Sequence, residues 1–311
     1  MRLLITGGAG FIGSNLARLA ASHGHEVVII DNLATGYRDN VDTNRATFHE
    51  IDITATSALQ ECMQGVDSVI HLAALGSVPR SIASPIPTHE TNVNGTLSVL
   101  EAARHAGVPH IVMSSSSSVY GANPTLPKSE RQWVRPLSPY AASKLAGEQY
   151  LLAYGSTYNI STLAFRFFNV FGPGQRAGHA YAAVIPVFID AILSGRPMPI
   201  NGDGKNSRDF TYVGTVCEVL LDAATRRVSH PEPVNLAFGT NTNLNALTEQ
   251  ISAATGLPAN IEYRPPRPGD VKHSQAENAT LKSLFPDVRP VDLTEGLQET
   301  VAWFNRNALQ Q

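Results

Sequence analysis

The stretch that decides the fold is residues 2–13, which read RLLITGGAGFIG. A short apolar strand runs into the glycine pattern Gly7-x-x-Gly10-x-x-Gly13, and the apolar-periodic segment Phe11–Ser22 predicts a helix directly after it. Glycines at this spacing make a tight turn, let the backbone approach a pyrophosphate, and allow helix and strand to pack closely. The helix N-terminus then offers free N–H groups and a partial positive charge to phosphates. The stretch therefore predicts a dinucleotide-binding turn.

An acidic residue in the right place supports this interpretation. The second apolar run, Glu26–Ile30, is followed by Asp31, roughly 20 residues after the glycines, as the dinucleotide fingerprint requires. Asp31 is expected to bind the hydroxyls of the adenosine ribose and to repel a 2′-phosphate, which favours NAD over NADP. The nearby Arg38 keeps NADP open as an alternative, and a strand-end turn residue is the other interpretation of Asp31.

The first half of the chain alternates strand-like and helical segments. Strands are expected at Leu3–Thr6, Val27–Asp31, Thr47–Ile51, Ser68–Ala73, His110–Ser115 and Thr162–Phe168. Helices are expected at Phe11–Ser22, Ala55–Met63, Ile86–Ala106 and Pro139–Tyr154. Several strand-like runs are apolar throughout, which is typical of a parallel sheet covered on both faces. The order predicts an α/β fold with a doubly wound parallel (Rossmann) sheet, whose ligands lie outside the carboxyl ends of the strands.

Loops lengthen after about Phe168, where proline and glycine cluster, as in Gly172-Pro173-Gly174. Short strands and helices mix in this region, which indicates a smaller mixed α/β C-terminal lobe. We predict a Rossmann domain at 1–168, with returning segments from about 205–240. The partly discontinuous lobe at 169–311 is expected to close over the cofactor.

Composition excludes several classes of function. The chain has 311 residues, of which 43% are hydrophobic and 16% charged, as is ordinary for a globular enzyme. Its net charge of -3 and its lack of a basic block disfavour a nucleic-acid partner. The two cysteines, Cys62 and Cys217, and the ten histidines show no disulfide or metal-ligand spacing. With no long apolar run and no signal peptide, the chain is expected in the cytoplasm, away from membranes.

A tyrosine and a lysine, Tyr140 and Lys144, lie four residues apart in a segment that begins with Pro139. In a helix they share one face. A phenol titrates near pH ~10, and a nearby fixed positive charge lowers that pKa, so the pair suits a proton acceptor for an alcohol. The same spacing also occurs on solvated helix faces. Five serines, Ser114–Ser118, end a predicted strand, where a hydroxyl could bind the reacting oxygen or simply form a polar strand exit.

Motifs along the whole chain are similar to those of one superfamily. In order they are TGGAGFIG at 6–13, HLAA at 71–74, NVNGT at 92–96, SSSSSVYG at 114–121, YAASK at 140–144, RFFNVFG at 166–172, NGDG at 201–204, RDF at 208–210 and RPGD at 267–270. Together they resemble the extended short-chain dehydrogenase/reductase superfamily. Within it they resemble the NAD-dependent nucleotide-sugar epimerases, above all those that act on UDP-N-acetylglucosamine.

The resemblance implies roles for the matching residues. Tyr140 would be the acid/base, Lys144 would hold the nicotinamide ribose and lower the pKa of the tyrosine, and Ser116 would bridge to the sugar. The implied NAD contacts are Gly7, Gly10, Phe11, Ile12, Gly13, Asp31, Asn32, Asp52, Ile53, Leu72, Ala73, Ala74, Asn92, Tyr140 and Lys144. The implied contacts of the UDP-sugar are Ser77, Arg80, Ser116, Ser117, Asn169, Arg176, Ala183, Val184, Arg208, Arg267, Asp270 and Ser274. The two arginines at 208 and 267 suit a diphosphate, although each also suits a surface salt bridge.

The resemblance leaves the reaction to be chosen. Ser116-Ser117-Ser118 stand where the related 4,6-dehydratases carry Thr-Asp-Glu, and a serine is too weak an acid or base at neutral pH to remove water. Epimerisation at C4 through a transient 4-keto sugar, with NAD regenerated in each turnover, is therefore expected. A uronic acid decarboxylase, a net reductase that consumes its cofactor, and a non-enzymatic cofactor sensor are the alternatives. A homodimer through helices at Ile86–Ala106 and Pro139–Tyr154 is also implied.

Small residues suggest the sugar. Ser274 and Ala183 leave room for an N-acetyl group, and the segments Ala74–Ser81 and Ala180–Pro186 resemble those of epimerases that act on N-acetylated UDP-hexosamines. UDP-N-acetylglucosamine and UDP-N-acetylgalactosamine are thus expected, with UDP-glucose and UDP-galactose as further candidates. Arg176 lies where similar UDP-glucuronate epimerases carry an arginine suited to a carboxylate, so a UDP-glucuronate 4-epimerase is the alternative.

Overall fold

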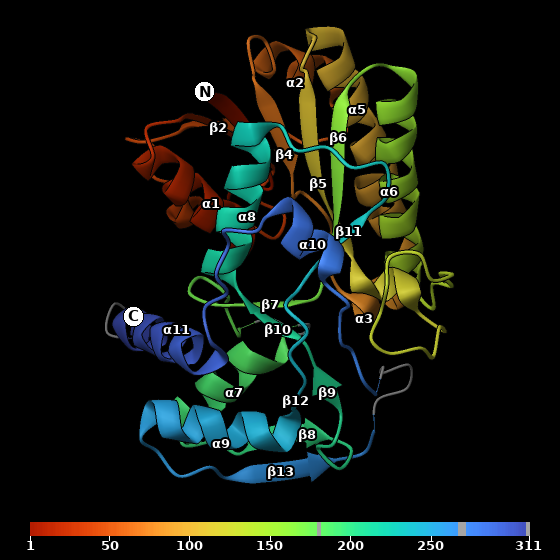
Figure 1. Cartoon of the computed structure of the whole chain (residues 1–311). Helices are drawn as coiled ribbons and strands as arrows, with labels where there is room; N and C mark the ends of the chain where they lie inside the picture. Colours follow the sequence, from red (N-terminus) through yellow and green to blue (C-terminus); the bar gives the residue numbers. More distant parts are fainter. Residues whose placement is uncertain (179–181, 267–271, 309–311) are drawn as a thin grey trace.

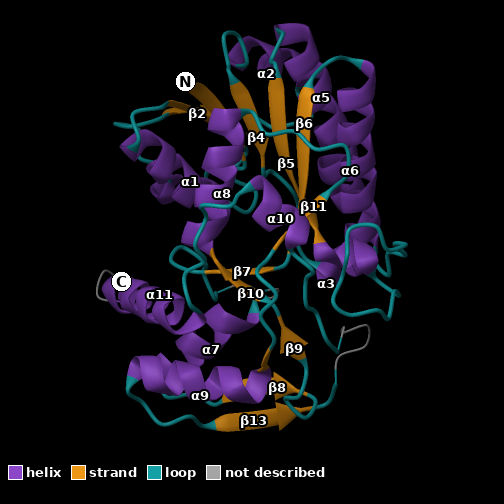
Figure 2. Cartoon of the chain, in the orientation of Figure 1, coloured by secondary structure: helices purple, strands orange, loops and turns teal. Residues whose placement is uncertain are grey.

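The computed structural model describes residues 1–178, 182–266 and 272–308. Its main feature is a seven-stranded sheet with the strand order β11-β6-β5-β4-β1-β2-β3 (Figures 1 and 2). The strands are β1 (Arg2–Thr6), β2 (Glu26–Asp31), β3 (Thr47–Glu50), β4 (Ser68–His71), β5 (His110–Ser116), β6 (Ser161–Phe167) and β11 (Val234–Leu236). All neighbouring pairs in this sheet run parallel. The predicted doubly wound Rossmann sheet is confirmed.

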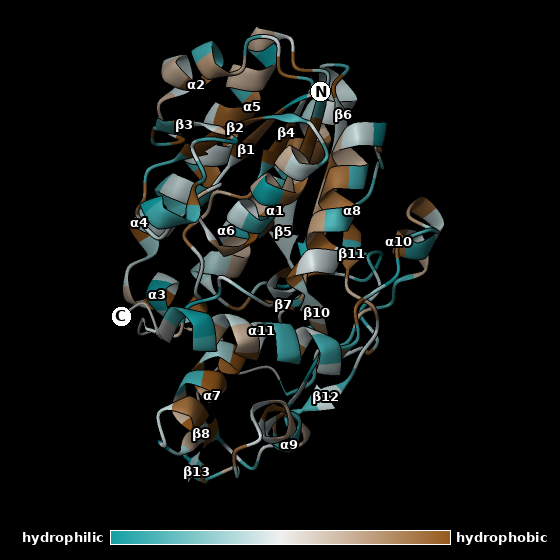
Figure 3. Cartoon of the chain, turned by 90° about the vertical axis from the view of Figure 1, so that its left-hand side faces the viewer, coloured by the Kyte–Doolittle hydropathy of each residue, from teal (hydrophilic) through white to brown (hydrophobic). Residues whose placement is uncertain are grey.

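Helices cover both faces of this sheet. One face is covered by α1 (Phe11–Ser22), α8 (Val213–Arg226) and α10 (Ala279–Leu284), and the other by α2 (Thr56–Cys62), α5 (Gly95–Ala106) and α6 (Pro139–Thr157). Along β1, Leu3 and Ile5 pack into the first of these cores and Leu4 into the second, and all three are fully buried. Because both faces are covered, the strands read as apolar runs, and Figure 3 shows several of them in its hydrophobic colours.

The strand order reverses between β1 and β4, and this reversal positions the site. From β1, the strands β2 and β3 extend the sheet to one side, while β4, β5, β6 and β11 extend it to the other. In open α/β sheets a crevice forms at this point, outside the carboxyl ends of the strands. Gly7 follows β1, Leu72 follows β4, and Ser116 ends β5, so three of the predicted site residues meet at one edge.

The helix predicted at Ile86–Ala106 is interrupted. The structure has α4 (Pro85–His89), then a π-helical turn, η2 (Glu90–Asn94), and then α5. The buried side chain of Asn92 sits in this wide turn, where it accepts a hydrogen bond from the Leu75 backbone N–H at 2.7 Å and donates one to the Leu75 carbonyl at 3.2 Å. Single π-helical turns inside helices often accompany functional sites.

In the first half of the chain, which is described throughout, three short helices lie outside the predicted elements. The helix α3 (Val78–Ala83) begins where the Ser77 hydroxyl accepts a hydrogen bond from the Arg80 backbone N–H at 3.2 Å, with proline in its first turn. The other two are the 3₁₀ turns η1 (Arg38–Asn40) and η3 (Ser117–Tyr120).

The remaining elements build a second core around α7 (Val184–Leu193), α9 (Leu244–Thr255) and α11 (Leu293–Ala308). Three small sheets accompany them, pairing β7 (Asn169–Phe171) with β10 (Phe210–Tyr212), β9 (Ser207–Arg208) with β12 (Thr242–Asn243), and β8 (Met198–Asn201) with β13 (Ile261–Arg264). Figure 1 shows this core below the large sheet, to which α8 and β11 return. The division at residue 168 stays a prediction. In the part of the chain that the structure describes, no helix is both long and apolar enough to cross a membrane.

Candidate active site

The turn after β1 requires glycine at the predicted positions. Gly7 has φ +72°, and a Cβ there would lie 2.7 Å from the backbone nitrogen of Ala73. A Cβ at Gly13 would lie 2.2 Å from the Gly7 carbonyl oxygen, so only glycine lets α1 begin this close to the turn. Gly10 precedes α1, and no side chain caps the helix there. The first N–H groups of α1 are therefore available to phosphate oxygens, as the dinucleotide interpretation requires.

Asp31 orders the same turn. Its carboxylate accepts hydrogen bonds from the Ala9 backbone N–H at 3.0 Å and the Leu33 backbone N–H at 2.8 Å. Burial raises the pKa of this carboxyl, and the two hydrogen bonds oppose the rise. Each carboxylate oxygen keeps a lone pair for a ribose hydroxyl. The guanidinium of Arg38 lies 4.1 Å over the Phe48 ring, outside the cavity, which favours NAD over NADP.

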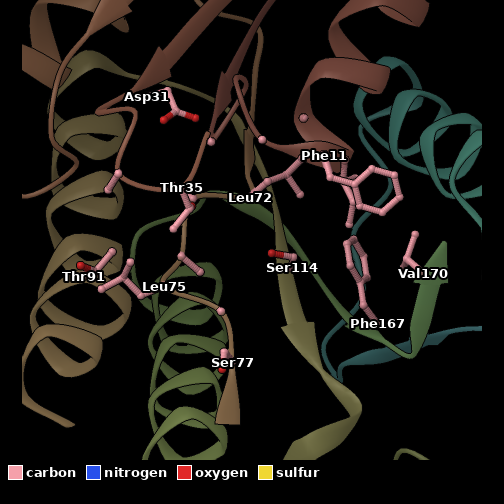
Figure 4. Close-up of a pocket in the computed structure, with 18 of the residues that line it drawn as sticks. Phe11, Asp31, Thr35, Leu72, Leu75, Ser77, Thr91, Ser114, Phe167 and Val170 are labelled. Atoms are coloured by element: carbon pink, nitrogen blue, oxygen red, sulfur yellow. The ribbon is translucent and has the colours of Figure 1, made fainter. Parts of the chain in front are cut away.

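A cavity of about 660 Å³ extends from this turn to the ends of β4, β5 and β6. In Figure 4, Asp31, Thr35 and Thr91 lie on one side of it, and Phe11, Phe167 and Val170 on the other. The predicted residues that line the cavity are Gly7, Gly10, Phe11, Ile12, Gly13, Asp31, Asn32, Ile53, Leu72, Ala73, Ala74, Ser77, Arg80, Ser116, Tyr140, Lys144, Arg176 and Ala183. The glycine turn, Asp31 and the tyrosine–lysine pair thus share one cavity.

The helix α6 carries Tyr140 and Lys144 into this cavity. It begins after Ser138, whose hydroxyl accepts a hydrogen bond from the Ala141 backbone N–H at 3.2 Å, with Pro139 in its first turn. Burial lowers the pKa of the Lys144 ammonium to about 8, and the charge of Glu148 opposes this shift. Burial raises the pKa of the Tyr140 phenol, and the hydrogen-bonded hydroxyl of Ser116 opposes that rise. The net shift of the phenol in this structure is therefore the opposite of the predicted one, because burial outweighs the hydrogen bond from Ser116.

The serines at the end of β5 differ in their hydrogen-bond partners. Ser116 lines the cavity, and its Oγ accepts hydrogen bonds from the Ser118 hydroxyl at 2.8 Å and the Ser118 backbone N–H at 3.2 Å. Its own proton can then serve the phenol or a ligand oxygen. Ser115 also lines the cavity, and its hydroxyl donates to Glu148 Oε2 at 2.6 Å. Ser117 does not line the cavity.

The sequence profile described as the NAD dependent epimerase/dehydratase family matches residues 3–237. The chain belongs to this family. The UDP-glucose 4-epimerase of Mycolicibacterium smegmatis is 37% identical over 99% of this chain and 100% of its own length. The UDP-N-acetylglucosamine 4-epimerase of Methanobrevibacter ruminantium M1, solved with UDP-N-acetylmuramic acid, is 37% identical with a TM-score of 0.93, covering 98% of both chains. The UDP-glucose 4-epimerase of Thermotoga maritima, solved with UDP-glucose, is 33% identical with a TM-score of 0.94, covering 99% of this chain and 100% of its own.

The cofactor of this family member is NAD, and relatives have been solved with NAD bound. The glycine turn and the carboxylate of Asp31 fit that cofactor. A dTDP-glucose 4,6-dehydratase is also 32% identical, so membership establishes an NAD-dependent nucleotide-sugar epimerase or dehydratase. Among the residues described, no group of three or more His, Cys, Asp or Glu side chains could hold a metal ion.

Several predicted site residues lie off the cavity lining. They are Asp52, Asn92, Ser117, Asn169, Val184, Arg208 and Ser274. Asn92 contacts Tyr140 indirectly. Its side chain donates to Ser143 Oγ at 2.9 Å, and the Ser143 hydroxyl donates to the Tyr140 carbonyl at 2.8 Å. Asp52 accepts a hydrogen bond from the Asn32 side chain at 2.7 Å. Arg267 and Asp270 lie outside the described residues, and the substrate roles of the others stay predictions.

Other residues line the cavity without having been assigned a contact from the sequence. They are Ala34, Thr35, Tyr37, Asn40, Ile51, Leu75, Gly76, Thr91, Ser114, Ser115, Phe167, Phe168, Val170, Gly174 and Gln175. Most of them follow a strand or flank a predicted residue, so the strand-end rule could have indicated them.

A buried ion pair beneath the site was also not predicted from the sequence. Glu148 accepts hydrogen bonds from Arg166 Nη2 at 2.7 Å and Arg166 Nε at 3.0 Å, and the two side chains are only 0% and 4% exposed. Arg166 lies opposite Ser115 in the register of β5 and β6. Glu148 therefore joins α6 to both strands, one turn beyond Lys144.

Proposed function

We propose that the chain is a nucleotide-sugar 4-epimerase that interconverts UDP-N-acetylglucosamine and UDP-N-acetylgalactosamine through a transient 4-keto sugar, and that it also accepts UDP-glucose and UDP-galactose. The observation that carries this proposal is that Tyr140, Lys144 and Ser116 line the same cavity as the glycine turn, with Ser116 hydrogen-bonded to the Tyr140 phenol and no carboxylate at 117 or 118. The relatives named as 4-epimerases support it.

When bound, NAD supplies the acceptor for the hydride and then its donor. Tyr140 takes the proton from the 4-hydroxyl of the sugar, while Ser116 hydrogen-bonds the same oxygen and fixes its position. A positive charge on Lys144, one helical turn from Tyr140, would favour the phenolate. After the keto sugar turns its other face, Tyr140 returns the proton to the same oxygen, so one residue serves as base and then as acid.

The surroundings of Ser116 argue against elimination of water. Ser118 is committed to hydrogen bonds with Ser116 Oγ, and Ser117 lies off the cavity. Removal of water from a keto sugar needs an acid and a base that serines do not provide at neutral pH. The cavity is therefore equipped for oxidation and re-reduction and not for elimination.

Ala183 and Arg176 bear on the choice of sugar. Ala183 lines the cavity and its small side chain leaves space beside a bound sugar, whereas Ser274 lies off the lining. The Arg176 guanidinium lies 3.7 Å from the centre of the Tyr37 ring, next to the NAD turn. This placement supports a neutral N-acetylated sugar over a uronic acid, whose carboxylate would need that guanidinium.

We also propose a homodimer built on α4, α5 and α6. Ile86 on α4 is 72% exposed and Tyr150 on α6 is 40% exposed. Exposed apolar side chains on packed neighbouring helices suit a helical interface. Light scattering after size-exclusion chromatography should give twice the monomer mass, and a monomer at micromolar concentration would exclude this assembly.

Proton NMR of the purified protein with each UDP-sugar, without added cofactor, tests the reaction. We expect the anomeric signals of both C4 epimers to appear from either N-acetylated sugar, with no lasting change in absorbance at 340 nm. A stoichiometric rise or fall at 340 nm, or the loss of water from the sugar, would contradict a 4-epimerase.

Tyr140→Phe tests the role of the phenol, because it removes only one hydroxyl from a residue that lines the cavity. We expect turnover to fall at least ~100-fold, as for loss of a general acid–base residue, with NAD still bound. Retained activity would exclude the assigned role of Tyr140.

A further inference from the structure

Two residues that the proposed reaction does not use meet beside the NAD turn. The Arg176 guanidinium lies 3.7 Å from the centre of the Tyr37 ring, and both residues line the cavity. Tyr37 comes from the loop after β2, and Arg176 comes from the loop after β7. Tyr37 is 40% exposed, so the contact lies at the surface of the molecule.

Both loops are tied to the dinucleotide-binding turn. The Tyr37 backbone N–H donates to the Ala9 carbonyl at 3.0 Å, and the Asn40 side chain donates to the same oxygen at 2.8 Å. From the other loop, the Pro173 carbonyl accepts a hydrogen bond from the Asn15 side chain at 2.9 Å. The contact between the Tyr37 side chain and the Arg176 guanidinium therefore links two loops, and each loop is hydrogen-bonded to the glycine turn or to the start of α1.

We propose that Arg176 and Tyr37 form a bridge that retains NAD, which leaves the protein only when this contact opens. A guanidinium over a tyrosine ring is held by cation–π attraction. Its positive charge also lies beside a turn built for a pyrophosphate, so bound cofactor adds to the attraction. Retention suits an enzyme that returns the hydride to its substrate, because such an enzyme never needs to exchange cofactor. The inference rests on NAD binding alone and does not depend on which sugar is bound.

The rate of NAD release tests this bridge. Purified protein with its bound NAD is mixed with excess fluorescent etheno-NAD, and the exchange is followed by fluorescence. Arg176→Ala and Tyr37→Ala should each speed release roughly three- to thirtyfold, which corresponds to the loss of one cation–π contact. The double variant should be no faster than the faster single variant, because both changes open the same contact.

Two variants serve as controls on the same loop. Tyr37→Phe keeps the ring and should release NAD at the wild-type rate. Arg38→Ala removes the neighbouring guanidinium, which lies over Phe48 and outside the cavity, and should also leave the rate unchanged. Because Tyr37 and Arg38 are both exposed, neither substitution disturbs the core.

Unchanged release in both alanine variants, or effects that multiply in the double variant, would overturn the bridge. So would an Arg176→Ala protein with normal NAD release and a raised KM for UDP-glucuronate, which would assign the guanidinium to a sugar carboxylate. The readout is independent of turnover. Failure of the epimerase assay would therefore leave the release rates interpretable, and the two proposals fail separately.

Discussion

Replacing Lys144 by methionine should stabilise the protein while removing its activity. The side chain is only 5% exposed, and burial lowers the pKa of its ammonium from 10.5 to about 8. A lowered amine pKa means that the fold disfavours the charged form. Since one pKa unit corresponds to about 1.4 kcal/mol, the charged lysine reduces the free energy of unfolding by about 3 kcal/mol. Methionine fills a similar volume without a charge.

The size of this stabilisation depends on pH in a defined way. Below pH 8, Lys144 is charged in the folded and the unfolded chain, and the wild type bears the full penalty. Between about pH 8 and 10.5 the unfolded chain still holds the proton that the folded chain has lost, so the wild type gains stability with rising pH. Above that range the penalty disappears. His71 adds nothing to this pH dependence between pH 8 and 10.5, because burial and the charge of Lys144 lower its pKa to about 3, so it stays neutral there.

Urea unfolding of NAD-free wild type and Lys144→Met, followed by circular dichroism from pH 7 to pH 10.5, measures the difference directly. We expect the variant to be more stable by about 3 kcal/mol at pH 7, with the advantage shrinking towards zero at the alkaline end. Lys282→Met, which removes an exposed lysine from α10, is the matched control and should show neither effect. A variant no more stable than the wild type at pH 7, or an advantage independent of pH, would refute the reasoning.

Two further substitutions test the parts of the fold that hold the site. Glu148→Gln leaves the Arg166 guanidinium buried without its counter-charge and should lower the free energy of unfolding by about 3–5 kcal/mol in urea titrations. Most of that loss should return in Glu148→Gln/Arg166→Met, and a loss below ~1 kcal/mol in the single variant would contradict a buried pair of this kind. Gly13→Ala places a Cβ 2.2 Å from the Gly7 carbonyl oxygen and should reduce NAD content at purification at least ~10-fold. Exposed Gly178, where a Cβ meets nothing within 4 Å, provides the control, and equal NAD content in both alanine variants would count against the close packing of α1.

The large sheet was predictable because its signals are local. The glycine turn fixes one strand–turn–helix unit, and continuous apolar runs indicate strands buried on both faces. The π-helical turn at Glu90–Asn94 was not predictable, because it depends on the contact of buried Asn92 with the Leu75 backbone, 17 residues away. The helix α3 could have been predicted, since Ser77 and Pro79 are recognised start signals.

The positions of site residues were predictable where they follow from strand ends and motif spacing. Their pKa values and buried partners were not predictable, because these depend on burial. Tyr140 and Lys144 share the cavity with Asp31, as their motifs indicated. The direction of the net pKa shift of Tyr140 depends on how deeply the phenol is enclosed, which spacing does not reveal. Arg166 could not be assigned to Glu148 without the pairing of β5 with β6.

The position of Glu148 explains how α6 can carry a buried ammonium. Because hydration of a charged amine is favourable, a loosely held helix would shift until Lys144 reached water. Glu148 lies on the same stripe of α6 and is held by two hydrogen bonds from Arg166 and one from Ser115, so this movement would break a buried ion pair. The tie also fixes Ser116, the next residue of β5, relative to Tyr140. The proposed 4-epimerisation needs this rigidity because the sugar turns over between the two half-reactions, while the base must meet the same oxygen each time. The charge buried beneath the cavity therefore sets the position of the residues that line it.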